Sequence, residues 1–374
     1  MNRWPDKYVI GLTGNIATGK SVVRKMLEHL GAYGIDADAL SHRAIAKGAP
    51  GYQPAIDSFG KWILKPDGEI DRARLGRVVF NDPEAMQRLE AIIHPLVQQA
   101  IDLMVRRSTQ RVIVIEAIKL LEGNLRGMCS SIWVVSVPPE MQIQRLIEKR
   151  ALSREDAAQR VNFQGSAQQK IDAAHVVIQN NGSYEDTWKR VLAEWKIIAP
   201  AAEPAPQPVP TAQGSFSIAR GRPRDSLQIA QLITRLGGIA TSQDEIMAAF
   251  GEKAFMLLQM GGKSVGVAGW QVENLVARTT EFYIDPSVDL EKGLAVLMSE
   301  VERASLDLQC EASILYLPKA LAGLHATWKQ LGYEPRAANS LGVQAWTDAA
   351  NESVRPHTQL FFKQLRLDRV LRPI

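Results

Sequence analysis

Cysteine is scarce in this chain of 374 residues, which has only Cys129 and Cys310. Two distant cysteines cannot build the disulfide framework of a small secreted domain, so we expect free thiols in a reducing compartment or two small buried hydrophobic side chains. Long apolar runs are also missing, since no stretch reaches the about 18 residues that span a bilayer. The amino terminus shows no charged-then-apolar signal pattern. We therefore expect a cytoplasmic protein without a membrane partner.

A strong excess of one charge is absent as well. The formal net charge is +4 and the isoelectric point about 9.0, and no basic run carries interleaved aromatic residues. This mild positive charge fits phosphorylated small molecules and gives no indication of a nucleic-acid partner. With 46% hydrophobic and 22% charged residues the composition is that of a globular protein. The sequence leaves the oligomeric state open.

The chain is longer than one hydrophobic core usually supports, so two domains are expected. The clearest boundary is the stretch "IIAPAAEPAPQPVPTAQGS", where proline and alanine alternate with almost no charge. Such a composition favours an extended, semi-rigid spacer. We predict a first domain at 1–198, a linker at 199–213 and a second domain at 214–374.

The first segment alternates apolar strands with helical patterns. The predicted strands are "KYVIGLTG", "AYGIDAD", "RVIVIEA", "SSIWVVSV" and "AHVVIQNNG". Continuous apolar strands separated by helices indicate a doubly wound α/β parallel sheet. In such a sheet the ligand lies at the carboxyl ends of the strands.

A glycine-rich loop follows the first of these strands. The pattern Gly14-x-x-x-x-Gly19-Lys20-Ser21 is that of a phosphate-binding loop, whose backbone amides and following helix cradle an anion. Lys20 would meet the outer phosphates and the Ser21 hydroxyl would ligate Mg²⁺. An ordinary strand–turn–helix connection needs one glycine and has no use for Lys-Ser at this spacing. The residues expected to bind ATP are Gly14, Asn15, Ile16, Ala17, Thr18, Gly19, Lys20, Ser21 and Val22.

The acceptor side of a phosphoryl transfer needs a base. Asp36 and Asp38 end the second strand at the same sheet edge as the loop, and one of them is placed to accept the proton of an attacking hydroxyl. The alternative is that they cap the helix that follows, although a cap explains only one of them. His94, beside a proline, is a candidate for the site or a structural residue. The basic residues Arg145, Lys149, Arg150 and Arg154 form either a lid over the phosphates or a solvated surface.

Several motifs together resemble one family. "IGLTGNIATGKS", "GIDAD", "SFGKWILKPDGEIDRARLGRVVF", "LEAIIHP" and "QNNG" occur in the order and at the spacing of dephospho-coenzyme A kinases, over residues 8 to 195. This resemblance implies a P-loop kinase that transfers the γ-phosphate of ATP to the ribose 3′-hydroxyl of dephospho-coenzyme A, the last step of coenzyme A synthesis. It implies Asp38 as the base, His94 as a substrate-binding residue and Arg145 as a catalytic lid residue.

Three positions depart from the family pattern. Asn15 stands where the family usually has a second glycine, Lys119 replaces a proline, and His175 replaces an aspartate. The last two changes bear on acceptor affinity and lid closure. Two alternative functions remain at this point. They are another small-molecule P-loop kinase, and a nucleotide-dependent regulatory or scaffold protein with an acyl-coenzyme A-sensing second domain.

The second segment has a different order of elements. A strand, two helices, a three-stranded meander with a Gly261-Gly262 hairpin, a helix, a strand and "WKQLGYE" resemble the Gcn5-related N-acetyltransferase fold. This resemblance implies a coenzyme A or acetyl-coenzyme A loop at the start of the central helix. Gly293 and Ala295 keep half of its pattern, but Leu290 replaces an Arg or Gln and Glu291 adds negative charge. The sequence therefore predicts weak or absent binding there, or a plain amphipathic helix. It also predicts a tethered module whose deletion leaves the kinase chemistry intact.

Overall fold

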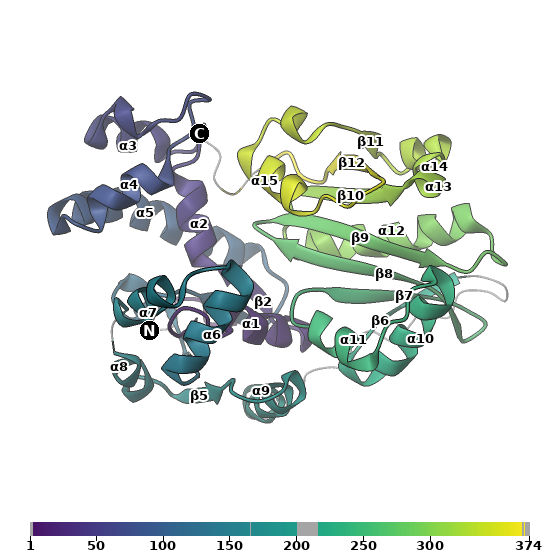
Figure 1. Ribbon diagram of the computed structural model, residues 1–374, viewed down its shortest axis with the longest axis horizontal. Helices are drawn as coiled ribbons and strands as arrows, with labels where there is room; N and C mark the ends of the chain where they lie inside the picture. The colour runs from purple at the N-terminus through teal and green to yellow at the C-terminus, as the bar shows by residue number, and fades with distance from the viewer. Residues whose placement is uncertain (1–2, 165, 200–215, 369, 371–374) are drawn as a thin grey trace.

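The computed structural model describes residues 3–164, 166–199, 216–368 and 370, and it contains two sheets (Figure 1). The first has five strands and the second seven. The linker predicted at 199–213 lies outside the described residues apart from its first position. In the described part of the chain, no helix is long and apolar enough to cross a membrane.

The first sheet is fully parallel, as the continuous apolar strands predicted. All five predicted strands are present, and the strand that carries the glycine-rich loop is central. In spatial order the strands are β2 (Tyr33–Asp36), β3 (Val112–Glu116), β1 (Tyr8–Thr13), β4 (Ser131–Ser136) and β5 (Val176–Gln179). The doubly wound α/β fold is thereby confirmed.

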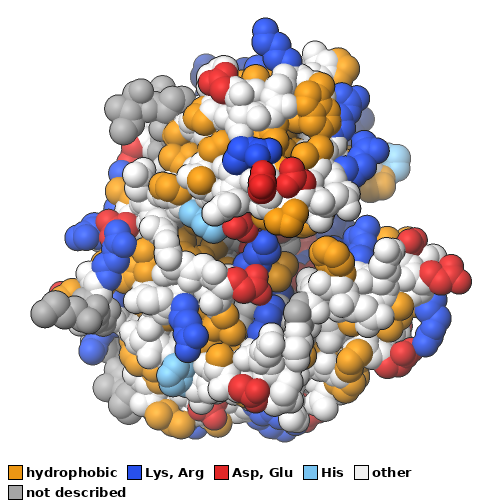
Figure 2. All heavy atoms as spheres, turned by 90° about the vertical axis from the view of Figure 1, so that its left-hand side faces the viewer, with side chains coloured by type: hydrophobic (Ala, Val, Ile, Leu, Met, Phe, Trp, Pro, Cys, Tyr) orange, Lys and Arg blue, Asp and Glu red, His pale blue; other side chains and the backbone are white. Residues whose placement is uncertain are grey.

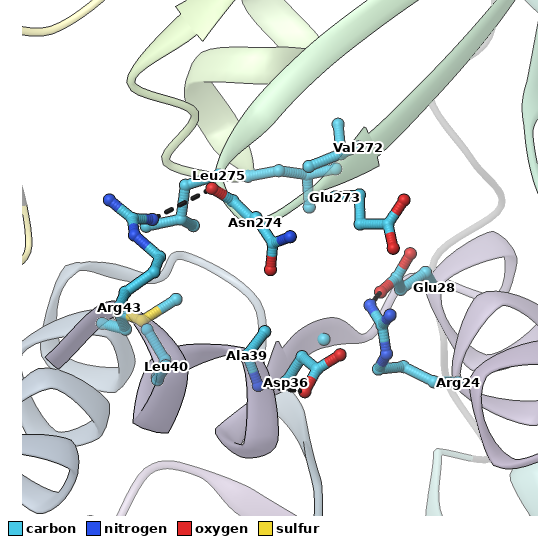
Figure 3. Close-up of a pocket in the computed structure, with 13 residues that line it drawn as sticks. Arg24, Glu28, Asp36, Ala39, Leu40, Arg43, Val272, Glu273, Asn274 and Leu275 are labelled. Atoms are coloured by element: carbon cyan, nitrogen blue, oxygen red, sulfur yellow. Dashed lines mark hydrogen bonds and ion pairs between the residues drawn. The ribbon is translucent and has the colours of Figure 1, made fainter. Parts of the chain in front are cut away.

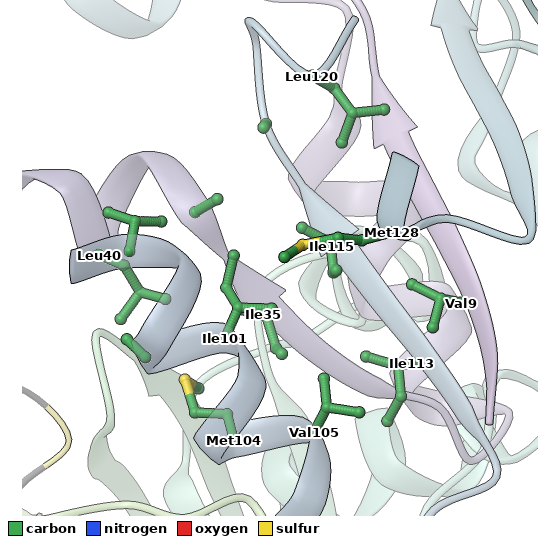
Figure 4. Packing of buried hydrophobic residues seen from close by; sticks show 14 of the residues in the cluster. Val9, Ile35, Leu40, Ile101, Met104, Val105, Ile113, Ile115, Leu120 and Met128 are labelled. Carbon is green, nitrogen blue, oxygen red and sulfur yellow. The ribbon is translucent and has the colours of Figure 1, made fainter. Parts of the chain in front are cut away.

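Helices cover both faces of this sheet. On one face α1 (Lys20–His29) and α9 (Tyr184–Ile198) pack on the strands, and on the other face α2 (Ala37–Ala44) and α5 (Pro83–Arg107) do so. Figure 4 shows the second of these cores, in which residues such as Ile113 of β3 meet α2 and α5. Both faces are therefore buried, which explains why these strands read as apolar throughout.

Two further groups of helices frame the carboxyl edge of the sheet. The first, packed on the amino-terminal half of α5, comprises α3 (Tyr52–Phe59), η1 (Lys61–Ile63) and α4 (Arg72–Val79). The second comprises α6 (Pro139–Arg150), α7 (Arg154–Asn162) and α8 (Ala167–Asp172). A short turn, η2 (Asn124–Met128), precedes β4.

The second sheet begins with four antiparallel strands. They are β6 (Phe216–Arg220), β7 (Ala254–Met260), β8 (Lys263–Glu273) and β9 (Val276–Ile284). Gly261 and Gly262, with φ of 57° and 78°, make the β7–β8 hairpin, as predicted. The long helix α12 (Leu290–Asp307) then leads to β10 (Ala312–Pro318), which runs parallel to β9. The order of elements predicted for this segment is confirmed.

The remaining elements complete this second sheet. Its last strands are β11 (Glu334–Pro335) and β12 (Thr358–Gln364), and β12 pairs antiparallel with β10. The helices are η3 (Pro223–Asp225), α10 (Ser226–Gly237), α11 (Gln243–Ala249), α13 (Lys319–Ala322), α14 (His325–Gln330), η4 (Ala338–Ser340) and α15 (Gln344–Glu352).

The two halves are packed against each other. Leu275, in the turn between β8 and β9, is buried in the core between the first sheet and α5. Gln309 donates its side-chain N–H to the carbonyl of Met104, 2.7 Å away, and His29 contacts the carbonyl of Phe250 at 2.9 Å. These buried contacts are at odds with a second half that is attached only through a linker.

Candidate active site

The glycine-rich loop joins the central strand β1 to α1. Gly14 and Gly19 have φ of 152° and 88°, and a Cβ on Gly19 would lie 2.2 Å from Nδ2 of Asn180. Both positions therefore require glycine, for conformation and for space. The resulting curl places the backbone amides of the loop at the amino-terminal end of α1, where the helix dipole favours an anion.

Lys20 and Ser21 begin α1 directly after this curl. The Lys20 ammonium is buried and donates to the carbonyl of Asn15 at 3.2 Å. Burial lowers the pKa of Lys20, while the nearby carboxylates of Glu116 and Asp38 oppose the shift. Such a desolvated cation interacts strongly with any phosphate that enters the loop.

The Ser21 hydroxyl is fixed by an acid at the end of the neighbouring strand. It donates to Oε1 of Glu116 at 2.8 Å, and Arg24 holds the other carboxylate oxygen at 2.7 Å. Glu116 is 4% exposed, so this orientation is held in a low-dielectric setting. An oriented serine oxygen beside a phosphate-binding loop is a suitable ligand for Mg²⁺.

The two aspartates at the end of β2 have different roles. Asp36 is the N-cap of α2 and accepts the backbone N–H of Ala39 at 2.8 Å. Asp38 lies in the first turn of α2 and accepts only the backbone N–H of Ile118 among the described hydrogen bonds, at 3.1 Å. Burial, followed by the negative charge of Asp36, raises the pKa of Asp38 to about 6. The capping interpretation thus holds for one aspartate, and the other is a carboxylate suited to take a proton near neutral pH.

Two cavities meet at Asp38. One, of about 570 Å³, is lined by residues 16–17 and 19–22 of the loop and helix α1 together with Asp36, Asp38 and Glu116. The other, also about 570 Å³ and mostly apolar, lies between α2, α5 and the segment after β3. Asp38, His42 and Ile118 line both. Figure 2 shows the face on which charged side chains of both signs surround a hollow between the upper and lower parts of the molecule.

The basic residues after β4 divide into two sets. Arg145 donates to the loop carbonyls of Ala17 and Thr18 at 3.2 and 3.3 Å and to the carbonyl of Asn180 at 2.7 Å. Lys149 and Arg150 line the cavity over the loop. Arg154 instead pairs with an exposed glutamate of α6, Glu140, at 2.6 Å and lines neither cavity.

Of the remaining sequence candidates, two line the second cavity and one lies away from it. His94 is on α5 and lines that cavity. Lys119 lines it as well and pairs with Glu90 at 3.1 Å. His175 is elsewhere, at the start of β5, where its Nδ1 accepts the backbone N–H of Ile132 at 3.0 Å. The Lys119 departure therefore bears on the cavity, whereas His175 stabilises the pairing of two strands.

Sequence reasoning missed several residues of this site. Glu116 lies at the end of the predicted strand "RVIVIEA", and an acid at that place beside the loop is a signal that could have found it. Asn180 donates to the carbonyl of Thr18 at 2.9 Å, and Gln164 accepts the backbone N–H of Ile16 at 2.6 Å. Lys170 lines the second cavity and donates to the carbonyl of Ile118 at 3.1 Å. Asn180 belongs to the "QNNG" motif, but the contacts that these three residues make depend on chain crossings that no local pattern reveals.

The start of α12 is where the sequence suggested a coenzyme A loop around Gly293 and Ala295. Asp289 is the N-cap of α12 and accepts the backbone N–H of Lys292 at 3.1 Å. Glu291 accepts a hydrogen bond from the Thr327 hydroxyl at 2.9 Å. Two carboxylates therefore lie at the first turn of this helix. That of Asp289 already accepts a hydrogen bond from one of the backbone amides that would have to bind the pyrophosphate.

Comparison with known proteins agrees with the geometry of the first half. The family model described as "Dephospho-CoA kinase" matches residues 8–186. The dephospho-CoA kinase of Carboxydothermus hydrogenoformans is 41% identical over 50% of this chain and 94% of its own length. That of Geobacter metallireducens is 42% identical, over 50% of this chain and 95% of its own.

For the second half, the solved ribosomal-protein-S18-alanine N-acetyltransferase of Escherichia coli aligns over 41% of this chain and 96% of its own. The TM-score is 0.33 and the identity 15%. Relatives at about 40% identity are covered over 94% and 95% of their length, and the family model spans the P-loop sheet, so the first half can be classified. Through that half, the chain belongs to the dephospho-CoA kinase family.

Proposed function

We propose that residues 1–198 form a kinase domain that transfers the γ-phosphate of ATP to the ribose 3′-hydroxyl of dephospho-coenzyme A. The observation that carries this proposal is the position of Asp38 in the wall shared by two cavities. One cavity has the loop that suits a nucleotide triphosphate, and the other has the size and apolar lining that suit a large acceptor. An acceptor hydroxyl at the junction would meet both the base and the γ-phosphate.

The residues of the first cavity have complementary roles in this reaction. The loop amides and Lys20 would hold the β- and γ-phosphates where charge develops in the transition state. Asp38 would orient the hydroxyl and accept its proton, for which its raised pKa of about 6 is suited. Arg145, already docked on the loop, would add positive charge near the phosphates. His94 would contact the acceptor in the second cavity.

Mg²⁺ fits the residues around the loop. Within the described residues no group of three or more His, Cys, Asp or Glu side chains could hold a metal alone. Mg²⁺ does not need such a group, because in kinase sites it binds through few protein ligands and the phosphates of the substrate. Ser21, oriented by Glu116, would be its protein ligand. When bound, the ion would neutralise charge on the phosphates.

The test compares one loop variant with a matched control. Lys20→Ala should abolish most phosphorylation of dephospho-coenzyme A, because the buried cation beside the phosphates is lost. Arg154→Ala removes a basic side chain that lines neither cavity and should leave the rate unchanged. Product analysis by mass spectrometry, with other small alcohols as competing acceptors, checks the substrate. Near-normal activity of Lys20→Ala, or preference for another acceptor, would refute the proposal.

The second domain, residues 214–374, is proposed to have no acetyltransferase activity of its own. Asp289 and Glu291 carry negative charge at the place where the pyrophosphate of coenzyme A would bind. Leu290 stands where an arginine or glutamine would support that binding. These contacts also disfavour the alternative of an acyl-coenzyme A sensor. We further propose that the protein works in the cytoplasm on small-molecule substrates, without nucleic-acid or membrane partners.

A further inference from the structure

The turn between β8 and β9 enters the kinase domain. Asn274 and Leu275 have φ of 51° and 61°, the conformation of a tight two-residue hairpin, and Leu275 is only 8% exposed. Leu275 belongs to the same buried cluster as Leu40 of α2. Figure 3 shows the turn directly above α2 and the small cavity of about 40 Å³ between them. The second domain thus contacts the helix that carries Asp38.

Arg43, in the last turn of α2, ties that helix to the second domain. Its Nη2 lies 2.6 Å from Oε2 of Glu311, and its Nη1 donates to the carbonyl of Asn274 at 2.9 Å. The side chains of the pair are 11% and 1% exposed. The backbone N–H of Glu311 also donates to the carbonyl of Leu275 at 2.7 Å. Arg43, Glu311 and the turn are therefore one network, buried at Glu311 and Leu275, in which loss of either charge removes the ion-pair partner of the other.

Helix α2 presents different faces to the two domains. Asp38, Ser41 and His42 line the acceptor cavity. Ala39, Leu40 and Arg43 line the small cavity against the second domain, and Ala39 and Arg43 also line the cavity over the loop. The helix has only eight residues, and its amino-terminal end holds the catalytic carboxylate. Because so short a helix moves as one body, a tilt at the Arg43 end displaces the Asp38 end as well.

We propose that the second domain is a positioning element of the kinase: Glu311 and the turn at residues 273–275 hold Arg43, and through α2 they fix Asp38 against the phosphate loop. This inference rests on the proposed function. Glu311 is a positioning residue in it. Arg43 lines the cavity over the loop, but it is assigned no contact with the reacting atoms and acts in this inference through α2. Displacement of a base by about 1 Å can cost about 100-fold in rate.

The charges that surround Asp38 provide a readout specific to its position. They come from four elements: Asp36 at the start of α2, Glu116 at the end of β3, Lys20 on α1 and Lys170 on α8. A shift of α2 relative to β3, α1 and α8 changes these distances and the burial of the carboxyl. The acid limb of the pH profile of kcat/KM reports the base in the free enzyme. A loss of correctly folded protein lowers the rate but does not move that limb.

The test uses Arg43→Met and Glu311→Gln in the full chain. Arg107→Ala is the matched control, because it breaks another ion pair between the two halves, with Asp368 at 2.9 Å, on a helix other than α2. We expect a fall in kcat of about 10–100-fold for both variants, a displaced acid limb, and faster hydrogen exchange of the α2 amides. The double variant should be no worse than the more damaged single variant. The control should behave as the wild type.

The proposal is overturned if both variants keep the wild-type acid limb and α2 exchange, whether or not they are less stable. It is also overturned if Arg107→Ala produces the same changes. Glu311→Asp, which keeps the charge, serves as a second variant if Glu311→Gln does not fold. The acid limb of its kcat/KM profile should lie closer to that of the wild type. Failure of Lys20→Ala to lose activity would refute the kinase assignment itself, so the two outcomes are distinguishable.

Discussion

Replacement of Asp38 by asparagine should raise stability while it removes activity. Burial and the charge of Asp36 raise the pKa of Asp38 from the ordinary 3.8 to about 6. A shift of about two units corresponds to about 3 kcal/mol of unfavourable free energy for the ionised form in the folded state. Because solvent in the two cavities screens part of this, we expect a gain of about 1–2 kcal/mol for Asp38→Asn. A base that costs stability is a common feature of active sites.

The pH dependence of this gain has a defined sign. The folded state binds the Asp38 proton more tightly than the unfolded state, since its pKa is the higher one. Above about pH 6 the group is ionised in both states and the full penalty applies. Between pH 6 and pH 3.8 the penalty fades, and below that range it is absent. The advantage of Asp38→Asn should therefore be complete at pH 7.5 and visibly smaller at pH 5.

Urea unfolding of both proteins at pH 7.5, 6 and 5 measures this difference. Asp57→Asn, at an exposed position of α3, is the control and should change the stability little at any of these values. In parallel, the Asp38 variant should keep its affinity for ATP and lose about 100-fold or more in turnover. A variant that is less stable than the wild type at pH 7.5, or whose gain does not depend on pH, would refute the electrostatic reasoning. A variant that no longer binds ATP would show that Asp38 serves the nucleotide or the fold.

Three further outcomes are expected. Gly19→Ala should abolish ATP binding, measured by calorimetry, because its Cβ would collide with Asn180, whereas Gly31→Ala has a similar φ and nothing within 4 Å, and should bind ATP normally. A chain ending at residue 199 should unfold several degrees lower in a thermal scan than the full chain, because the core site of Leu275 is emptied; an unchanged midpoint would contradict the packed interface. The full chain should release no thiol from acetyl-coenzyme A with common amines, followed with a thiol reagent, and steady turnover would contradict our interpretation of the second domain.

The local chemistry of the site could be predicted from the sequence. The loop from Gly14 to Ser21 needs residue types at fixed spacing, since its anion-binding shape is made by neighbouring backbone groups. The pair Asp36 and Asp38 could be placed at the sheet edge for the same reason, because a parallel sheet brings strand ends together. The hydrogen bond from the backbone N–H of Ala39 shows that Asp36 is the helix cap. The sequence pattern alone left both aspartates as candidates for the cap and for the base.

The sequence by itself thus determined the parallel sheet, the phosphate loop, the two aspartates and the order of elements in both halves, because each follows from local periodicity or spacing. Only the tertiary structure decided which elements meet. It set Glu116 against Ser21, docked Arg145 on the loop, and placed His175 away from the site. It also packed the β8–β9 turn against α2, the helix that carries Asp38. Such contacts join residues up to hundreds of positions apart, and their energy comes from burial and charge pairing that no single segment encodes.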